Sequence, residues 1–61
     1  MAKYRKGDII RILDYMPERS HFLILDTSRK TIYHTLSLYD GVKEIYHKEA
    51  IDRELNVIKV G

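Results

Sequence analysis

Residues 31–47, TIYHTLSLYDGVKEIYH, form the stretch of this chain that decides the fold. The side chains of its first half alternate between two faces, one carrying Ile32, Leu36 and Leu38 and the other carrying Tyr33, Thr35, Ser37 and Tyr39. This period of two predicts a β-strand. Asp40-Gly41 then supplies a residue pair that tolerates positive φ in a tight turn. The stretch therefore predicts a β-hairpin whose aliphatic face packs against the other strands.

Two turn geometries are compatible with this hairpin, and each gives a different strand register. A two-residue loop at Asp40-Gly41 would pair Tyr39 with Val42, Leu36 with Ile45 and His34 with His47. A type I turn followed by a bulge at Gly41 would slip the pairing by one residue.

Three further runs have strand character: Ile9–Leu13, His21–Asp26 and Leu55–Val60. His21–Asp26 is the most apolar of them, with apolar side chains on both of its faces. A strand covered on both faces belongs in the middle of a sheet. Ile9–Leu13 is also apolar on both faces, and this pattern is typical of a strand that is wrapped into a small barrel.

The connections between these runs differ in character. Asp14–Ser20 contains Pro17, which cannot donate to a strand ladder, and it is long for a hairpin connection. Long loops are where binding contacts gather. Thr27–Lys30 is predicted to be a polar turn. Lys48–Glu54 mixes helix formers with charges and is too short for an independent helix, so a single 3₁₀ or α turn is predicted there.

Size and composition restrict the fold to one small domain. The chain has 61 residues and no cysteine, so it must form a compact apolar core or assemble with partners without help from disulfides. Its longest apolar run, Phe22–Leu25, is far too short to span a membrane, and the N-terminus lacks the apolar region of a secretory signal. We therefore expect a cytoplasmic protein that does not bind membranes.

Residues 1–6 are predicted to form a basic N-terminal arm, followed by a single domain over residues 7–61. The arm places Lys3, Arg5 and Lys6 around Tyr4. It is either a solvated, frayed terminus or an arm that contacts phosphate. The formal net charge of +2 permits nucleic-acid binding but does not require it.

Five short strands, a long first loop and a helical turn before the last strand form a series that resembles the SH3-like small barrel. The resemblance rests on the order of the elements over residues 7–60. Leu13-Asp14-Tyr15 is similar to the ALYDY-type segment of peptide-binding members, but the chain has no Trp to build their PxxP groove. Lys6-Gly7-Asp8 is similar to the opening of KOW-like barrels. The chain also resembles small barrels encoded by tailed bacteriophages.

Neither a metal nor a catalytic site is predicted. The three histidines, His21, His34 and His47, have no Cys or His partner at a zinc-ligand spacing. The serines lack a nucleophile-elbow context, and three glycines do not form a phosphate-binding loop. A barrel of this size is filled by side chains and leaves little room for a substrate. We expect no cofactor and no enzymatic activity.

Surface recognition is the function that the sequence favours. The predicted protein-binding residues are Tyr15, Met16 and Pro17 of the long loop together with Tyr33, Tyr39 and Tyr46 of the hairpin. Tyrosines on an outward sheet face could anchor a protein or stack bases, and Tyr also has a high strand propensity without any binding role.

The first alternative is weak, sequence-independent nucleic-acid binding through Lys3, Arg5, Lys6, Arg11, Arg29 and Lys30. Carboxylates gather in the second half of the chain and would repel phosphate there, which ranks a protein partner first. A structural subunit of a virion or other assembly, self-associating through repeated copies, is the second alternative.

Overall fold

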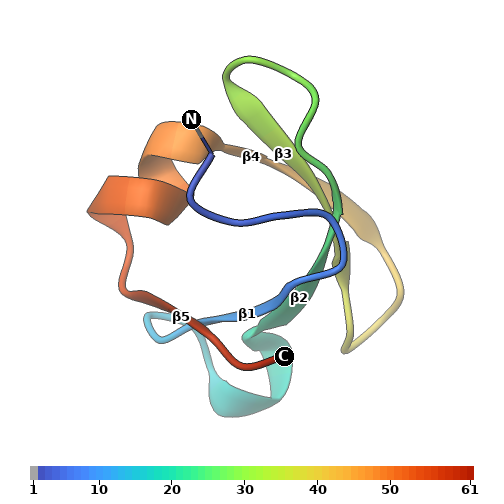
Figure 1. Cartoon of the computed structure of the whole chain (residues 1–61). Coiled ribbons are helices and arrows are strands. Elements are labelled where there is room, and N and C mark those ends of the chain that lie inside the picture. Colours follow the sequence, from blue (N-terminus) through green and yellow to red (C-terminus); the bar gives the residue numbers. More distant parts are fainter. Residues whose placement is uncertain (1) are drawn as a thin grey trace.

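The computed structural model describes residues 2–61, which form one antiparallel sheet of five strands (Figure 1). The strands are β1 (Ile9–Ile12), β2 (His21–Asp26), β3 (Ile32–Ser37), β4 (Lys43–His47) and β5 (Val57–Lys59). Their order in the sheet is β4-β3-β2-β1-β5. The all-β prediction of five strands is confirmed, and the apolar β2 lies in the middle. Within residues 2–61 the sheet is not closed, since β4 and β5 are its two edges.

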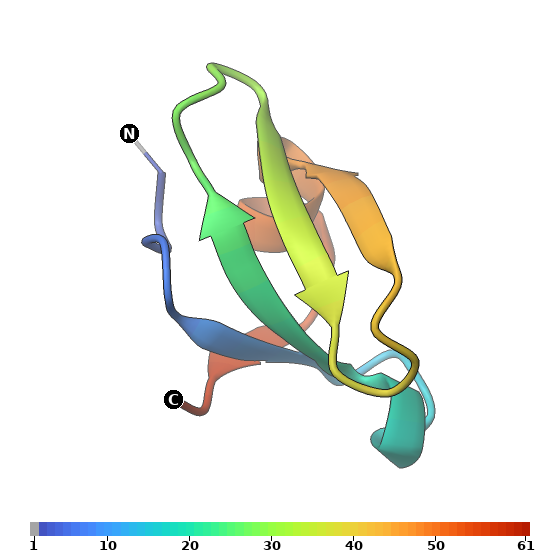
Figure 2. The same cartoon turned by 90° about the vertical axis from the view of Figure 1, so that its right-hand side faces the viewer.

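Two short helical turns lie between the strands. The turn predicted before the last strand is present as η2 (Ala50–Glu54), and its hydrogen bonding is of the π type, with the Leu55 amide donating to the Ala50 carbonyl at 2.8 Å. A 3₁₀ turn, η1 (Pro17–Arg19), lies within the long first loop. The Ser20 hydroxyl closes η1 by donating to the Pro17 carbonyl at 2.9 Å. Figure 2 shows η2 behind the strands, on the concave side of the sheet.

The core lies between the concave face of the sheet and η2. Its buried apolar side chains are Tyr4, Ile10, Ile12, Phe22, Ile24, Tyr33 and Ile51. Ile10 and Ile12 of β1 and Ile24 of β2 are fully buried, as the alternation of those strands requires. Ile51 comes from η2, so the π turn closes the core from the side opposite the sheet.

The inward face of β3 is the reverse of the predicted one. Tyr33, Thr35 and Ser37 are buried, while Ile32 and Leu36 on the other face are only partly covered. Alternation fixes the period of a strand but not which face turns inward. The polar atoms of the buried face have partners, because the Thr35 hydroxyl donates to the Glu44 carbonyl at 3.0 Å. Because these polar atoms are hydrogen-bonded, the hydrogen bonds offset the desolvation penalty of burying this face.

Tyr33 joins three parts of the chain through its hydroxyl. The hydroxyl donates to Asp52 Oδ1 in η2 at 2.7 Å and accepts from the Tyr4 amide at 3.3 Å. The Lys48 ammonium lies 5.6 Å from the centroid of the Tyr33 ring. Burial, followed by the hydrogen bond to Asp52, raises the pKa of Tyr33 to about 12. The phenol is therefore held in its neutral form inside the folded protein.

The N-terminal segment packs onto the sheet through one aromatic side chain. Tyr4 is only 5% exposed and its ring centroid lies 6.4 Å from that of Tyr33. The Gly7 amide donates to the Ile24 carbonyl at 2.8 Å, which fixes the start of β1 against β2. The frayed-terminus interpretation is therefore wrong for Tyr4. The division between an arm over residues 1–6 and a domain over residues 7–61 stays a prediction.

The hairpin register differs from both predicted geometries. The loop spans residues 38–41, with the Gly41 amide donating to the Ser37 carbonyl and the Ser37 amide to the Val42 carbonyl, each at 2.9 Å. His34 consequently pairs with Ile45, and His47 pairs with Ile32, so the predicted pairing of the two histidines is wrong. Gly41 has φ of +73°, which ends the loop in the left-handed region. The longer loop places this glycine at its fourth position.

Gly41→Ala should destabilise the protein through the backbone alone. A Cβ at this position meets nothing within 4 Å, so the positive φ is the sole source of strain. The expected loss in unfolding free energy is about 1 kcal/mol, measured by urea denaturation. Gly41→Asn should lose less, because Asn tolerates the left-handed region. Equal losses for both variants would contradict the assigned conformation.

Tyr33→Phe should lower the unfolding free energy by about 1.5–3 kcal/mol, because it removes a partly buried hydrogen bond to a carboxylate. The wild type should also lose stability as the pH rises from 10 towards 12. Its folded state holds the Tyr33 proton more tightly than the unfolded chain does, and that advantage disappears once both forms ionise.

The variant should lose less stability over this pH range than the wild type. Urea titrations of both proteins at several alkaline pH values measure the difference. A Tyr33→Phe protein as stable as the wild type at neutral pH would refute the hydrogen bond to Asp52.

Candidate functional site

Three of the predicted binding tyrosines come together around one hollow of about 420 Å³. Tyr15 comes from the first loop, Tyr39 from the β3–β4 loop and Tyr46 from β4. We call this hollow the aromatic groove. Its lining is completed by Arg19, Phe22, Ser37, Asp40 and Glu44.

Phe22 forms the floor on which two of the tyrosines are arranged. Its ring makes edge-on contacts with Tyr15, at a centroid distance of 6.0 Å, and with Tyr46, at 5.4 Å. Such geometry is favourable for aromatic pairs. Phe22 is itself held by β2 at the centre of the sheet. The arrangement of the tyrosines therefore depends on the central strand.

A hydroxyl pair connects the two sides of the aromatic groove. The oxygens of Tyr15 and Tyr46 lie 3.1 Å apart, and either can be the donor. Burial and the hydrogen bond with Tyr15 raise the pKa of Tyr46 well above its usual value. The Tyr46 hydroxyl is thus held in its neutral form, and the pair fixes the first loop onto β4.

The charged side chains of the aromatic groove carry both signs. The Arg19 guanidinium lies 4.8 Å from the centroid of the Tyr39 ring, and η1 places it there. Asp40 and Glu44 line the same hollow. The Asp40 carboxylate also accepts from the Val42 amide at 3.0 Å. Two carboxylates and one cation leave the groove with a net negative charge.

The remaining predicted protein-binding residues lie outside the hollow. Met16 and Pro17 are exposed in the first loop, with Met16 63% exposed, but neither lines the aromatic groove. Tyr33 is fully buried in the core, so the expectation that it lies on an outward face is wrong. Sequence reasoning missed Phe22 and Arg19. The signal for Arg19 was a cation in a loop that already carried an aromatic residue.

The six predicted nucleic-acid-binding residues come from three parts of the chain. Lys3, Arg5 and Lys6 belong to the N-terminal segment, and Arg29 and Lys30 to the β2–β3 turn, whereas Arg11 projects from β1 between His21 and Ile58. The Lys3 amide also lies 3.4 Å from an Asp52 carboxylate oxygen.

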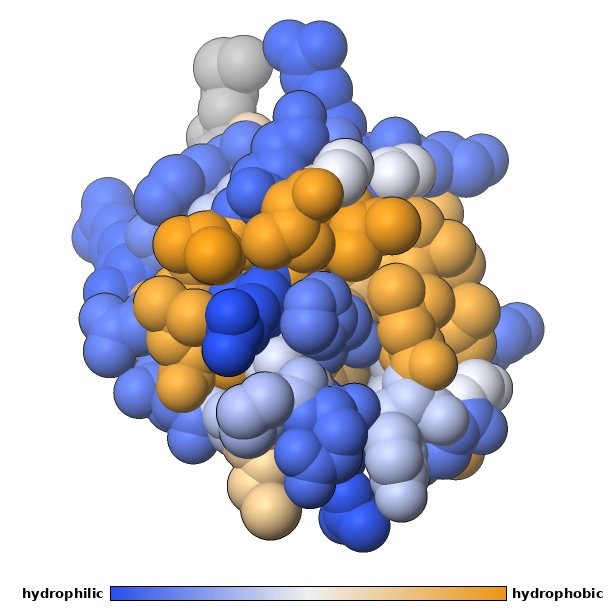
Figure 3. All heavy atoms as spheres, turned by 90° about the horizontal axis from the view of Figure 1, so that it is seen from below, coloured by the Kyte–Doolittle hydropathy of each residue, from blue (hydrophilic) through white to orange (hydrophobic). Residues whose placement is uncertain are grey.

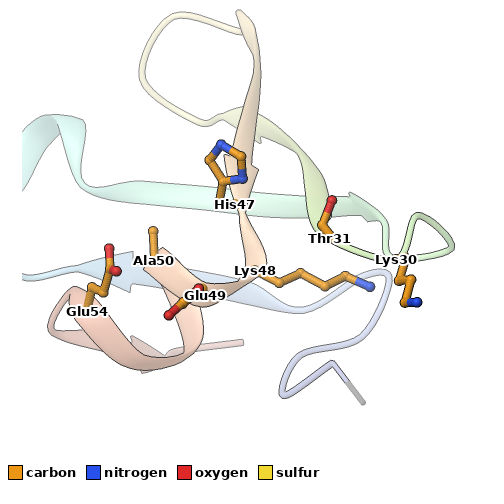
Figure 4. A pocket seen from close by; sticks show the side chains of 7 residues that line it. All are labelled: Lys30, Thr31, His47, Lys48, Glu49, Ala50 and Glu54. Carbon is orange, nitrogen blue, oxygen red and sulfur yellow. The ribbon is translucent and has the colours of Figure 1, made fainter.

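A second hollow, of about 510 Å³, lies beside the β2–β3 turn (Figure 4). Lys48 reaches across it toward Lys30, and its ammonium donates to the backbone carbonyls of Thr27, at 2.8 Å, and of Arg29. Glu49 and Glu54 line the same hollow. An anion would meet both carboxylates there, and one of the two lysines is already engaged by carbonyl groups.

Residues 2–61 hold neither a candidate metal centre nor a membrane-spanning helix. That part of the chain contains no group of three or more His, Cys, Asp or Glu side chains placed to hold a metal ion. Neither of its helical turns has the length and apolar character needed to cross a bilayer. Comparisons with protein-family models, curated proteins and solved structures gave no match.

The hydroxyl pair should be measurable as a coupling between two mild substitutions. Tyr15→Phe and Tyr46→Phe keep both rings on Phe22 and each removes one hydroxyl. In a double-mutant cycle, the two losses of unfolding free energy should fall short of additivity by about 0.5–1.5 kcal/mol. Strictly additive losses in urea denaturation would show that the two hydroxyls do not interact.

Proposed function

We propose that this chain is a non-enzymatic protein-binding module that holds a segment of a partner protein in the aromatic groove. The observation that carries the proposal is the convergence of Tyr15, Tyr39 and Tyr46 on one hollow with Phe22 beneath them. Tyr and Arg are the side chains that dominate the energetics of protein interfaces. The groove offers both aromatic faces and hydroxyl groups, so it suits apolar side chains next to hydrogen-bonding main chain.

Charge favours a protein over a nucleic acid in this groove. Asp40 and Glu44 stand beside the aromatic rings, and a phosphate backbone would be repelled there. Arg19 is the only cation among the lining residues, and it already stacks on Tyr39. The exposed Met16, at the edge of the same loop, extends the apolar contact area available to a partner.

We further propose that the fold is an open form of the SH3-like small barrel, in which the edge strands β4 and β5 do not pair with each other. The strand order, the long first loop and the helical turn before β5 support this assignment. The lack of enzymatic activity, a phage-encoded origin with a host or viral protein as partner, and a cytoplasmic location stay predictions from the sequence.

Peptides that bind the groove should be obtainable by selection from a random peptide library displayed on phage. For a selected peptide, Tyr39→Ala should weaken binding about tenfold, because Tyr39 is 54% exposed and an interface aromatic contributes more than about 1 kcal/mol. Leu13→Ala, which truncates an exposed apolar side chain outside the groove, serves as the matched control and should leave affinity unchanged. Fluorescence anisotropy measures both variants.

Salt and hydrodynamic size distinguish the alternatives in the same experiment. Binding of a peptide to an aromatic groove should change little between low and moderate salt, whereas binding of single-stranded DNA through phosphates falls steeply. The proposal is overturned if no peptide is selected and DNA binds, or if selected peptides are insensitive to Tyr39→Ala. A chain that assembles into large oligomers in light scattering would favour the structural-subunit alternative.

A further inference from the structure

The two edge strands of the sheet, β4 and β5, differ in how their outer sides are covered. β5 spans three residues, and its Val57 carbonyl accepts from the Tyr4 hydroxyl at 3.5 Å. The Lys59 ammonium lies 3.6 Å from an Asp8 carboxylate oxygen, so β5 also carries a paired charge. Short length and charged side chains are the means by which proteins block an edge strand. β5 is therefore a protected edge.

β4 is longer than β5, and it pairs with β3 in one continuous register without a bulge. Four of its five residues are exposed, and the side chain at its centre, Ile45, is 63% exposed. Figure 2 shows β4 at the border of the sheet, to the right of β3, and among residues 2–61 no further strand pairs with it there. A regular, uncovered edge of this kind is a template for another strand.

The backbone of β4 presents free hydrogen-bonding groups at every second residue. At one end of the strand the Val42 carbonyl accepts from the Ser37 amide at 2.9 Å. At the other end the Lys48 amide donates to the Thr31 carbonyl at 2.8 Å. Because groups that face the neighbouring strand alternate with groups that face away in an antiparallel ladder, the even-numbered residues of β4 face β3. The amides and carbonyls that turn to the open edge are those of Lys43, Ile45 and His47.

The open edge runs alongside the aromatic groove. Glu44 and Tyr46 of β4 line the groove, and both side chains lie on the inward face of the sheet. A strand paired with the outer side of β4 would place every second side chain beside these two residues. Its other side chains would lie beside Ile45. The edge and the groove can therefore receive the main chain and the side chains of one segment.

A second copy of the chain fits this edge less well than a strand from another protein. Pairing through β4 alone joins five residues of each copy, whereas a stable protein–protein interface uses roughly 20–30 residues a side. The two-fold pairing centred on Ile45 would also bring the two Glu44 carboxylates to diagonal positions on one face, where like charges repel.

The edge also specifies its occupant more narrowly than the apolar surface of the protein does. Apolar atoms form a band, with hydrophilic atoms set into it, on the side of the molecule that Figure 3 shows. Apolar contact is non-directional, so such a band accepts many shapes. The alternating amides and carbonyls of an edge strand instead fit an extended main chain.

We propose that the partner segment binds as an additional β-strand on β4. Its main chain pairs with the outward groups of Lys43, Ile45 and His47, and alternate side chains enter the aromatic groove. The inference rests on the proposed function, because the groove receives one face of the added strand. The partner is thus an extended segment with β-branched or aromatic residues at alternate positions, and not a helix or a proline-rich segment.

Amide hydrogen exchange on the whole chain tests this pairing, with a phage-selected peptide that Tyr39→Ala weakens as the probe. In the free protein, the amides of Lys43, Ile45 and His47 should exchange fast, and that of Tyr46 slowly. The bound peptide should slow the three outward amides about tenfold or more. Methylating the peptide amides one at a time should weaken binding about three- to tenfold at every second residue, because each loses one main-chain hydrogen bond.

Ile45→Pro removes an outward amide without taking a hydrogen bond from β3, a position where an edge strand tolerates proline. It should weaken peptide binding about tenfold. Ile45→Val is the matched control, because Val is close to Pro in size and keeps the amide, and its affinity should stay within about twofold of the wild type. If Ile45→Pro does not fold, the exchange and methylation results decide the question alone.

A Tyr39-sensitive peptide that leaves the three outward amides exchanging fast would overturn this inference and leave the proposed function standing. Peptides that are insensitive to Tyr39→Ala, or a selection that yields none, would overturn both. Outward amides that already exchange slowly in a dimer of the free chain, and speed up when Ile45→Pro dissociates it, would assign the edge to a second copy and overturn the inference as well.

Discussion

The hydrogen bond from the Tyr33 hydroxyl to Asp52, 2.7 Å long, ties the sheet to the π turn across the core. The same hydroxyl accepts from the Tyr4 amide, so the N-terminal segment is attached to the same point. A chain of this size without cysteine has few buried apolar side chains to hold it together. A tyrosine contributes a large ring to that core and a polar group that needs a partner. Asp52 supplies the partner, and the orientation of β3 follows from it.

The orientation of β3 decides what the surface of the protein can do. With Tyr33 and Thr35 inward, Leu36 and its neighbours across the sheet form an apolar outer face. Tyr46, the cross-strand partner of Tyr33, then meets Phe22, which Tyr15 contacts from the first loop. The chain therefore presents two separate surfaces, an aromatic groove with net negative charge and an aliphatic outer face. Side chains fill the interior of so small a protein, so only its outer surface is open to a binding partner.

Much of the fold was predictable because strands leave a local signal. Alternation located β3, the Asp-Gly turn located β4, and short apolar runs located the other three strands, with the bounds of β2 matching His21–Asp26. The direction in which β3 faces was not predictable, since alternation is symmetric between faces and the partner of Tyr33 lies in a distant turn. Tyr4 was missed for a related reason, because its basic neighbours gave the segment the composition of a solvated terminus.

The sequence identified the kinds of residue that form the site, but not which of those residues come together in the fold. The long loop and the hairpin tyrosines were identified, yet which tyrosines meet depends on the register of β3 and β4. That register depends on the four residues of the hairpin loop, where Asp-Gly was compatible with several loop lengths. Arg19 joined the groove through a 3₁₀ turn that leaves little trace in the sequence. Local sequence patterns therefore predicted the secondary-structure elements, whereas long-range contacts determine how these elements are arranged.

The inward orientation of Tyr33 is the claim on which both surfaces depend, and a nuclear Overhauser spectrum of the folded chain tests it most directly. The ring protons of Tyr33 should show cross-peaks to those of Tyr4, whose ring centroid is 6.4 Å away. Leu36 methyl groups should show none to the Tyr4 ring. Cross-peaks from Leu36 to Tyr4, together with a solvent-exposed Tyr33 ring, would contradict the account.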